Sequence, residues 1–393
     1  MLPEGWKRTT FEDHIDLLSG NPFKSAEYSN DPTDIRLLRG DNIEPGKLRW
    51  RDAKFWPTER IHNLTRYSLQ QGDFVIAMDR TWVSSGLKVA EVRSADLPCL
   101  LVQRVSRIRA LPTLCQSLLK QYFSGYSFEN YVKSVETETA VPHISAQQIK
   151  DFPFLLPPLP EQKKIAAILS TWDRAIEGTE KLLANSQQQK KALMQQLLTG
   201  KKRLPGFTGE WKNIALGELE KKGFLELGRG NVISKKDIAA HPGQNPIYSS
   251  SVKNCGLMGT YGHYMFDEEL ISWSVDGGGH FFHRKKHKFS ITNVSGYMRV
   301  DQKNLNYKFL CSQLQFLHEK LHFDYQTKAH PSVIRDLYIL NTPPLAEQKA
   351  IAAVLTTADE EITALESDLS HLRQEKKALI QQLLTGKRRV TVD

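Results

Sequence analysis

A long segment of this sequence occurs twice. One copy runs from Pro157 to Arg203 and the other from Pro343 to Arg389, and they align without a gap at a constant offset of 186 positions. About 28 of the 47 aligned residues are identical. Any fold proposed for the chain has to explain a repeat this regular.

Each copy predicts one long helix with a coiled-coil seam, because apolar residues recur at spacings of three and four over about five heptads. Pro157-Pro158 and Pro343-Pro344 bar extension backwards, and Gly200 and Gly386 supply C-terminal stops. About 38 residues would make each helix roughly 57 Å long. The seam residues are Ile165, Leu169, Trp172, Ile176, Leu183, Leu193 and Leu197, then Ile351, Leu355, Ile362, Leu365, Leu369, Leu372, Leu379 and Leu383. Thr179, Ser186 and Lys190 interrupt the first seam, and Lys376 interrupts the second.

A single helix of this kind leaves its apolar seam in water, so each needs a partner. Pairing between the two copies is favoured over a coiled coil that only oligomerises the protein, because each helix follows a segment long enough to bury its own core. The expected order is a domain at residues 1–156, a helix at 157–203, a second domain at 204–342, and a helix with its tail at 343–393. The fold class is mixed α/β (α+β), with the helices pairing as an antiparallel coiled coil and a pseudo-two-fold repeat.

Composition excludes several classes of protein. The net charge of +9 is spread along the chain, so it favours a polyanionic partner only weakly. The four cysteines are scattered without a C-x-x-C pair, which predicts free thiols in a reducing compartment. The sequence contains no run of about 18 apolar residues, so no membrane span is predicted. The start of the chain does not resemble a signal peptide, so a cytoplasmic location without membrane contact is expected.

The two domain segments share a pattern of short strands. The runs Ile35–Leu38, Phe74–Met78 and Leu100–Ile108 predict strands in the first, and a helix follows at Thr113–Tyr122. The second repeats this plan only loosely, with a helix expected at 305–318. Basic residues mix with aromatic ones between residues 36 and 66, which suits either nucleic acid or a solvated face. The run from His283 to Lys288 is interpreted as a cationic loop that contacts phosphate or is simply solvated.

Catalytic motifs are incomplete. His318, Glu319 and His322 match H-E-x-x-H, which keeps a zinc hydrolase as a remote alternative, but Tyr325 and Lys328 stand where a metzincin needs its Gly and third His. The glycines between Gly40 and Lys47 are misplaced for a Walker loop, and no G-x-G-x-x-G follows a strand. A binding subunit therefore fits better than an enzyme.

The duplicated P-P-L-x-E-Q…I-A-A-x-L…K-K-A-L-x-Q-Q-L-L-T-G-K segment resembles the conserved helices of the specificity subunit of type I restriction–modification enzymes. The order of domain, helix, domain, helix matches that family along the whole chain. The segments Leu69–Met78 and Cys99–Arg109 also resemble strand segments of that family. The glycine-rich approach to each helix found in many members is absent here, where residues 139–144 and 327–331 take its place.

This resemblance implies a non-catalytic subunit with two target recognition domains that read the halves of a split site in double-stranded DNA. Its implied partners are two DNA adenine methyltransferase subunits and restriction/translocase subunits, which would carry the S-adenosylmethionine, ATP and Mg; this chain would hold no cofactor and no metal. A subunit of a methyltransferase-only or type II-like system, and a coiled-coil adaptor without DNA reading, remain alternatives.

Side chains that read bases are commonly Arg, Lys, Asn or Gln. The candidate DNA contacts are Arg36, Arg39, Arg49, Arg51, Arg80 and Arg104 in the first domain, and Arg229, Lys253, Arg284, Lys285, Lys286, Gln326 and Lys328 in the second. Because the two helices are close copies while the domains differ, the helices are expected to meet the same partner twice.

Overall fold

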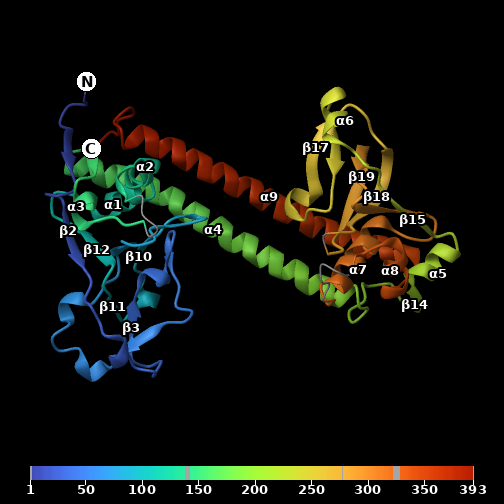
Figure 1. Cartoon of the computed structure of the whole chain (residues 1–393), viewed down its shortest axis with the longest axis horizontal. Helices are drawn as coiled ribbons and strands as arrows, with labels where there is room; N and C mark the ends of the chain where they lie inside the picture. Colours follow the sequence, from blue (N-terminus) through green and yellow to red (C-terminus); the bar gives the residue numbers. More distant parts are fainter. Residues whose placement is uncertain (1, 138–141, 277, 322–327, 393) are drawn as a thin grey trace. The chain divides into compact units, whose positions relative to one another are not determined.

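The computed structural model describes residues 2–137, 142–276, 278–321 and 328–392. It divides into two compact units, of which unit 1 holds residues 1–179 and 368–393 and unit 2 holds residues 180–367. The two repeated segments form the uninterrupted helices α4 (Leu159–Leu197) and α9 (Leu345–Leu383), each of 39 residues (Figure 1). Each unit contains one domain and a part of both helices, so the four segments expected from sequence describe the order along the chain.

The domain of unit 1 is built on two small sheets. One has the strand order β10-β7-β12-β2 and is antiparallel, and the other has the order β11-β3-β6 with β11 parallel to β3. Strand β1 pairs with β13 just before α4 begins. The elements are β1 (Lys7–Thr10), β2 (Ile15–Ser19), β3 (Ile35–Leu38), β4 (Ile43–Glu44), β5 (Lys47–Leu48), β6 (Lys54–Trp56), β7 (Phe74–Ala77), β8 (Trp82–Val83), β9 (Gly86–Leu87), β10 (Val89–Glu91), β11 (Cys99–Leu101), β12 (Val105–Ala110), α1 (Gln116–Phe123), α2 (Tyr126–Val135), α3 (Ala146–Lys150) and β13 (Pro153–Leu156).

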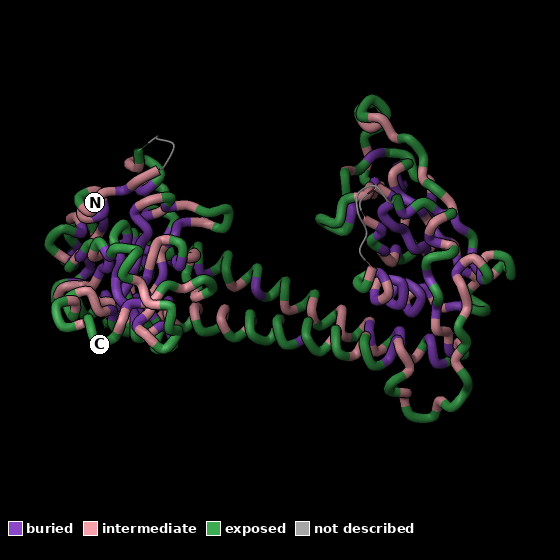
Figure 2. Tube along the Cα trace, turned by 60° about the horizontal axis from the view of Figure 1, so that its bottom comes forward, coloured by how far each residue is buried: buried purple, intermediate pink, exposed green. Residues whose placement is uncertain are grey.

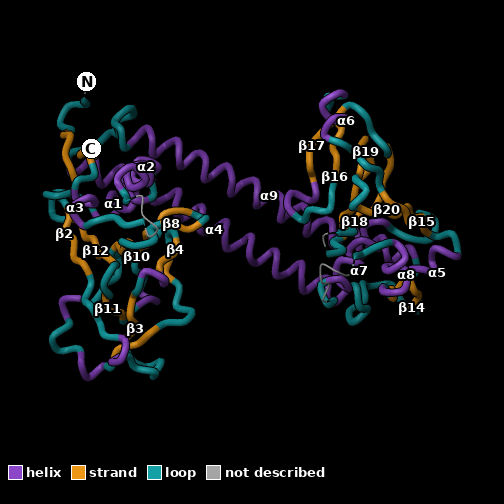
Figure 3. The backbone as a smooth tube through the Cα atoms, in the orientation of Figure 1, coloured by secondary structure: helices purple, strands orange, loops and turns teal. Residues whose placement is uncertain are grey.

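The domain of unit 2 is built on one sheet with the strand order β15-β20-β18-β19-β16-β17, in which only the β16–β19 pairing is parallel (Figure 3). Strand β14 pairs with β21 just before α9 begins, as β1 and β13 do before α4. The elements are β14 (Lys212–Ala215), α5 (Leu216–Lys221), β15 (Leu225–Arg229), α6 (Lys235–Ala240), β16 (Asn245–Tyr248), β17 (Leu257–Tyr261), β18 (Phe266–Ser274), β19 (Phe281–Ile291), β20 (Ser295–Val300), α7 (Tyr307–His318), α8 (Pro331–Leu337) and β21 (Ile339–Thr342).

The long helices run antiparallel within each unit. In unit 1 the first turns of α4 (Ile165, Leu169) share a core with the last turns of α9 (Ile380, Leu383). In unit 2 the last turns of α4 share a core with the first turns of α9, including Leu355. Every residue of the expected seam is buried or half-buried. Along the long helices, exposed residues alternate with residues that are at least partly buried (Figure 2). The predicted fold class, with two α/β domains and two paired helices, is confirmed.

Two expectations about strands are wrong. The apolar run 100–108 is two strands, β11 and β12, joined by a turn at Gln103-Arg104. The basic run 283–288 is not a loop but lies within β19, where alternate side chains face opposite sides of the sheet. Among the described residues, no helix has both the length and the apolar character needed to cross a membrane.

The core that α4 and α9 share in unit 2 can be tested by measuring stability. Truncation of the fully buried Leu355 to Ala should lower the free energy of unfolding by about 2–5 kcal/mol, because it removes apolar contacts and leaves a cavity. The measurement is the urea midpoint of the purified chain. Leu182→Ala is the control, since Leu182 is exposed on α4 and its loss should cost less than about 0.5 kcal/mol. Equal effects of both variants would contradict the packing described.

Candidate nucleic-acid interface

A buried glutamate anchors the start of α9 in unit 2. Glu347 belongs to the second P-P-L-x-E-Q motif, and its carboxylate accepts hydrogen bonds from Arg203 Nε at 2.5 Å and Arg203 Nη2 at 2.6 Å. Trp211 Nε1 donates to the same carboxylate at 3.1 Å. The hydrogen bond to Glu347 raises the pKa of the Arg203 guanidinium. A bidentate contact of this kind fixes orientation as well as charge.

Unit 1 contains the same anchor, built from the other copies of the same residues. The buried Glu161 accepts from Arg389 Nε at 2.6 Å, Arg389 Nη2 at 3.1 Å and Trp6 Nε1 at 2.7 Å. The arginine that ends each repeat therefore binds the glutamate that opens the other. These positions are identical in the two repeats, but the sequence alone does not predict this contact.

The glutamine beside each glutamate ties its helix to the domain. Gln162 Oε1 accepts from the Cys115 backbone N–H at 2.8 Å, and Gln348 Oε1 accepts from the Asn306 backbone N–H at 2.9 Å. Their amide groups donate to the carbonyls of Pro157 and Pro343, each at 2.9 Å. The E-Q pair thus satisfies buried polar groups at the same place in both units.

The lysines that interrupt the seams are paired across the helices. Lys376 Nζ lies 2.5 Å from Asp173 Oδ1 in unit 1, and Lys190 Nζ lies 2.5 Å from Asp359 Oδ1 in unit 2. A domain residue joins each pair, Gln121 at Asp173 and Lys308 at Asp359. Burial favours a higher pKa for Asp359, but the hydrogen bonds from Lys190 and Lys308 outweigh it and the pKa is lowered.

Four of the basic candidates in unit 1 gather around the turn that follows β3. Arg36 donates to the Ala95 carbonyl at 3.1 Å and lies over the Trp50 ring. Arg39 pairs with Asp41 at 2.7 Å, and Arg49 Nε donates to the Asp41 carbonyl at 3.1 Å. Arg51 is 85% exposed. These side chains form a polar surface with internal pairs.

Arg80 and Arg104 occupy neighbouring turns of unit 1. The Met78 backbone N–H donates to the Arg104 carbonyl at 2.9 Å, and Arg104 Nη1 lies 2.9 Å from Asp79 Oδ2. Both arginines have left-handed backbones, with φ of 49° and 66°, which a non-glycine residue adopts at a cost. Both side chains are exposed. Strain of this kind accompanies functional sites, so these turns are the strongest candidates in unit 1 for contact with DNA.

The same loop geometry recurs in unit 2. The Val275 backbone N–H donates to the Val294 carbonyl at 3.0 Å, as Met78 does to Arg104. Asp276 follows Val275 as Asp79 follows Met78, and Lys328 Nζ lies 3.2 Å from Asp276 Oδ1. The Ala329 backbone N–H donates to the Val275 carbonyl at 2.9 Å, as the Ile144 N–H donates to the Met78 carbonyl. Lys328 therefore takes the place of His143, whose Nδ1 lies 2.5 Å from Asp79 Oδ1.

Four of the remaining candidates in unit 2 are accessible to solvent. Lys253, Lys285, Lys286 and Arg229 are exposed, and Arg229 donates to the Asn293 carbonyl. Gln326 lies outside the described residues.

Arg284 does not fit its predicted role as a DNA contact, because the residue is only 5% exposed. Its guanidinium lies 3.7 Å from the Tyr248 ring centroid and donates to Ser272 Oγ and the Cys255 carbonyl. It holds its own sheet together and does not face solvent.

The described residues give the zinc-hydrolase alternative no support. Helix α7 ends at His318, so Glu319 lies beyond the helix, whereas an H-E-x-x-H site is built along a helix. His318 is buried with its Nδ1 2.9 Å from the Tyr338 hydroxyl, and burial lowers its pKa. His322 lies outside the described residues, and the part of the chain that is described contains no group of three metal-binding side chains.

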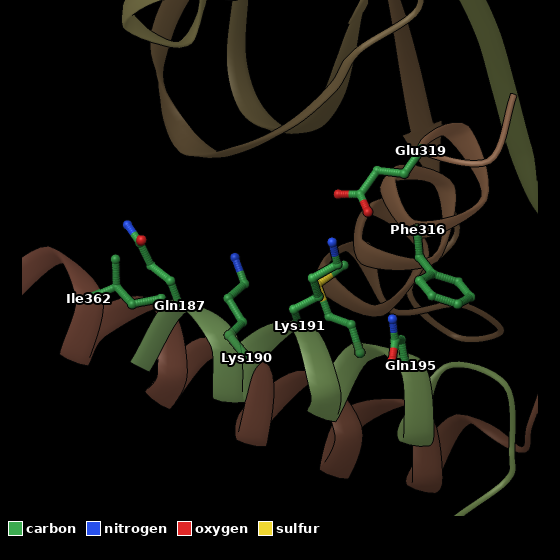
Figure 4. A pocket seen from close by; sticks show the side chains of 8 residues that line it. Gln187, Lys190, Lys191, Gln195, Phe316, Glu319 and Ile362 are labelled. Carbon is green, nitrogen blue, oxygen red and sulfur yellow. The ribbon is translucent and has the colours of Figure 1, made fainter. Parts of the chain in front are cut away.

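A cavity of about 300 Å³ lies within unit 2, between α4, α9 and the end of α7. Figure 4 shows Lys190 and Lys191 on α4 and Glu319 after α7 around this space. Its lining is mixed in charge and includes the apolar side chains of Phe316 and Ile362.

Comparison with known proteins agrees with this architecture. The chain is 35% identical over 182 residues to the type I restriction enzyme EcoAI specificity subunit of Escherichia coli, covering 46% of this chain and 30% of that protein. It is 28% identical over 204 residues to the MjaVIII specificity subunit of Methanocaldococcus jannaschii, covering 52% of this chain and 48% of that protein. The match thus spans a third to a half of these relatives.

Solved structures share the fold over the whole chain. The S subunit of a type I restriction-modification system from M. genitalium superposes with a TM-score of 0.67 at 14% identity, covering 98% of this chain and 97% of that one. A chain of another type I R-M system superposes with a TM-score of 0.56 at 17% identity, covering 99% and 100%. The family model described as type I restriction modification DNA specificity domain matches residues 3–185 and 208–371. Because these two regions include most of the chain, the protein belongs to the type I restriction modification DNA specificity family.

Proposed function

We propose that this chain is the non-catalytic subunit that reads a bipartite site in double-stranded DNA for a type I restriction–modification system. Each domain reads one half-site, and the paired helices set the length of the unread spacer. Two adenine methyltransferase subunits and the restriction/translocase subunits dock on this frame in the cytoplasm, and they carry the S-adenosylmethionine, ATP and Mg.

One observation carries this proposal. The Glu–Arg–Trp anchor occurs twice, with Glu161 in unit 1 and Glu347 in unit 2, but it holds two unlike domains. The first has two small sheets and the second a single six-stranded sheet. Because the helix anchors repeat while the two domains differ, this observation supports two domains that each read a different DNA sequence.

The surfaces of the two domains support contact with DNA. Arg80 and Arg104 in unit 1, and Lys285, Lys286 and Lys328 in unit 2, present exposed cationic side chains. Arginine and lysine bind guanine edges and phosphates, so these residues are proposed as the direct contacts.

Exchange of residues 1–156 for the corresponding segment of a relative with another specificity should change one half-site and leave the other. The readout is methylome sequencing of cells that express the assembled complex. The unchanged half-site is an internal control for folding and assembly. A change in both half-sites would contradict modular reading, and binding without any sequence preference would favour a coiled-coil adaptor.

A further inference from the structure

Lys88 is a buried lysine held between strands β9 and β10. Its backbone N–H donates to the Thr81 carbonyl at 2.7 Å, and its carbonyl accepts from the Ala77 N–H at 3.0 Å. The residue is only 6% exposed. Both backbone contacts fix where the side chain starts, so its direction is set by the fold.

The Lys88 ammonium has no hydrogen-bond or ion-pair partner anywhere in the described chain. An isolated buried charge is costly, and proteins normally pair it or replace it with an apolar side chain. Burial lowers the pKa of Lys88 most, while Asp41 opposes this and Arg49 and Arg80 add to it. Burial thus disfavours the charge of the amine, and the nearby Asp41 does not compensate for it.

The amine faces the turn that follows strand β3, and its Nζ is not among the described polar side-chain atoms that are closed to solvent. A Cβ placed on Gly40 would lie 3.9 Å from Lys88 Nζ and 3.7 Å from Ala77 Cβ, so the amine lies close to the backbone of the turn at Gly40–Asn42. Asp41, the nearby carboxylate, is paired with Arg39 at 2.7 Å. Arg49 and Arg80 are exposed.

We propose that Lys88, together with Arg49 and Arg80, binds a phosphate group of the DNA backbone, an inference that rests on the proposed DNA-reading function. A phosphate supplies the negative charge and the acceptor oxygens that the chain does not provide for Lys88. Such a contact fixes the register of the domain on the duplex and carries no sequence information. Free inorganic phosphate has the same chemistry and is the alternative source.

The test is Lys88→Met in the full chain assembled with its methyltransferase subunits. Affinity for duplex DNA should fall about tenfold, equally for cognate and unrelated sequences. The slope of log affinity against log salt concentration should become smaller by about 1, because one phosphate contact is lost. The melting temperature should stay the same or rise, because methionine replaces an unpaired buried charge with an apolar side chain of similar length.

Lys7→Met is the matched control, since Lys7 is an exposed lysine on β1, and its salt slope should not change. A lower melting temperature with an unchanged salt slope in Lys88→Met would overturn the proposal and make Lys88 structural. A loss confined to cognate DNA would also overturn it, because that result indicates base reading.

A second arm separates this proposal from the DNA-reading function. Inorganic phosphate, titrated without DNA, should raise the melting temperature of the wild-type chain and leave that of Lys88→Met unchanged. If the wild-type complex shows no DNA preference while this phosphate effect persists, the DNA-reading function fails and an anion site remains. If neither phosphate nor DNA distinguishes the two proteins, the site itself is refuted.

Discussion

Insertion of one heptad into both long helices is expected to lengthen the unread spacer of the DNA site by about 3 base pairs. Seven helical residues add about 10.5 Å, and successive base pairs are about 3.4 Å apart. The insertions belong after Ala184 in α4 and after Ala364 in α9. These positions face each other, because Lys190 pairs with Asp359 and Ser186 with Glu361 in the same register.

Methylome sequencing of cells that express this variant would show both original half-sites with the longer spacer, and no methylation at the original sites. An insertion in α4 alone is the control, since it misaligns the Lys190–Asp359 and Ser186–Glu361 contacts and should lower stability. An unchanged spacer in the matched variant would show that the helices do not set the separation.

Replacement of Glu347 by Gln is expected to lower the melting temperature of the chain by several degrees, comparable with the effect of Leu355→Ala. The change leaves Arg203 and Trp211 without the carboxylate that both contact. Differential scanning calorimetry measures the loss. Glu360→Gln is the matched control, since Glu360 is exposed on the same helix and its replacement should have little effect.

The pairing with Arg203 can be isolated with a double-mutant cycle. Glu347→Gln combined with Arg203→Met should lose less stability than the sum of the single changes, because the contact can be lost only once. Glu161→Gln and Arg389→Met should behave in the same way in unit 1. Strictly additive losses would mean that the anchor does not couple the ends of the repeats.

The long helices and several strands could be predicted because their signals are local. A seam of apolar residues between Pro-Pro and Gly stops located α4 and α9 to within a few residues, and the run at 35–38 is strand β3. The helix expected at 305–318 is α7, Tyr307–His318. The basic run at 283–288 was misinterpreted, because its composition concealed the alternation of a strand in which Arg284 faces inwards.

The polar contacts could not be predicted, because their partners are far apart in the sequence. Glu347 binds an arginine 144 residues away, and Glu161 binds one 228 residues away. Lys88 belongs to no motif, and only its burial draws attention to it. Part of the identity between the repeats is explained by contacts within this chain. That the helices also meet the same partner twice stays a prediction.

The anchor at Glu161 has a consequence for how the protein is made. The core of unit 1 includes Ile380, Leu383 and Leu384, and its buried glutamate is neutralised by Arg389. A ribosome synthesises these residues only after the whole of the second domain, so the core of the first domain stays incomplete while the second domain emerges. Premature termination shortly before residue 380 would leave the first domain without this part of its core although all of its strands had been synthesised.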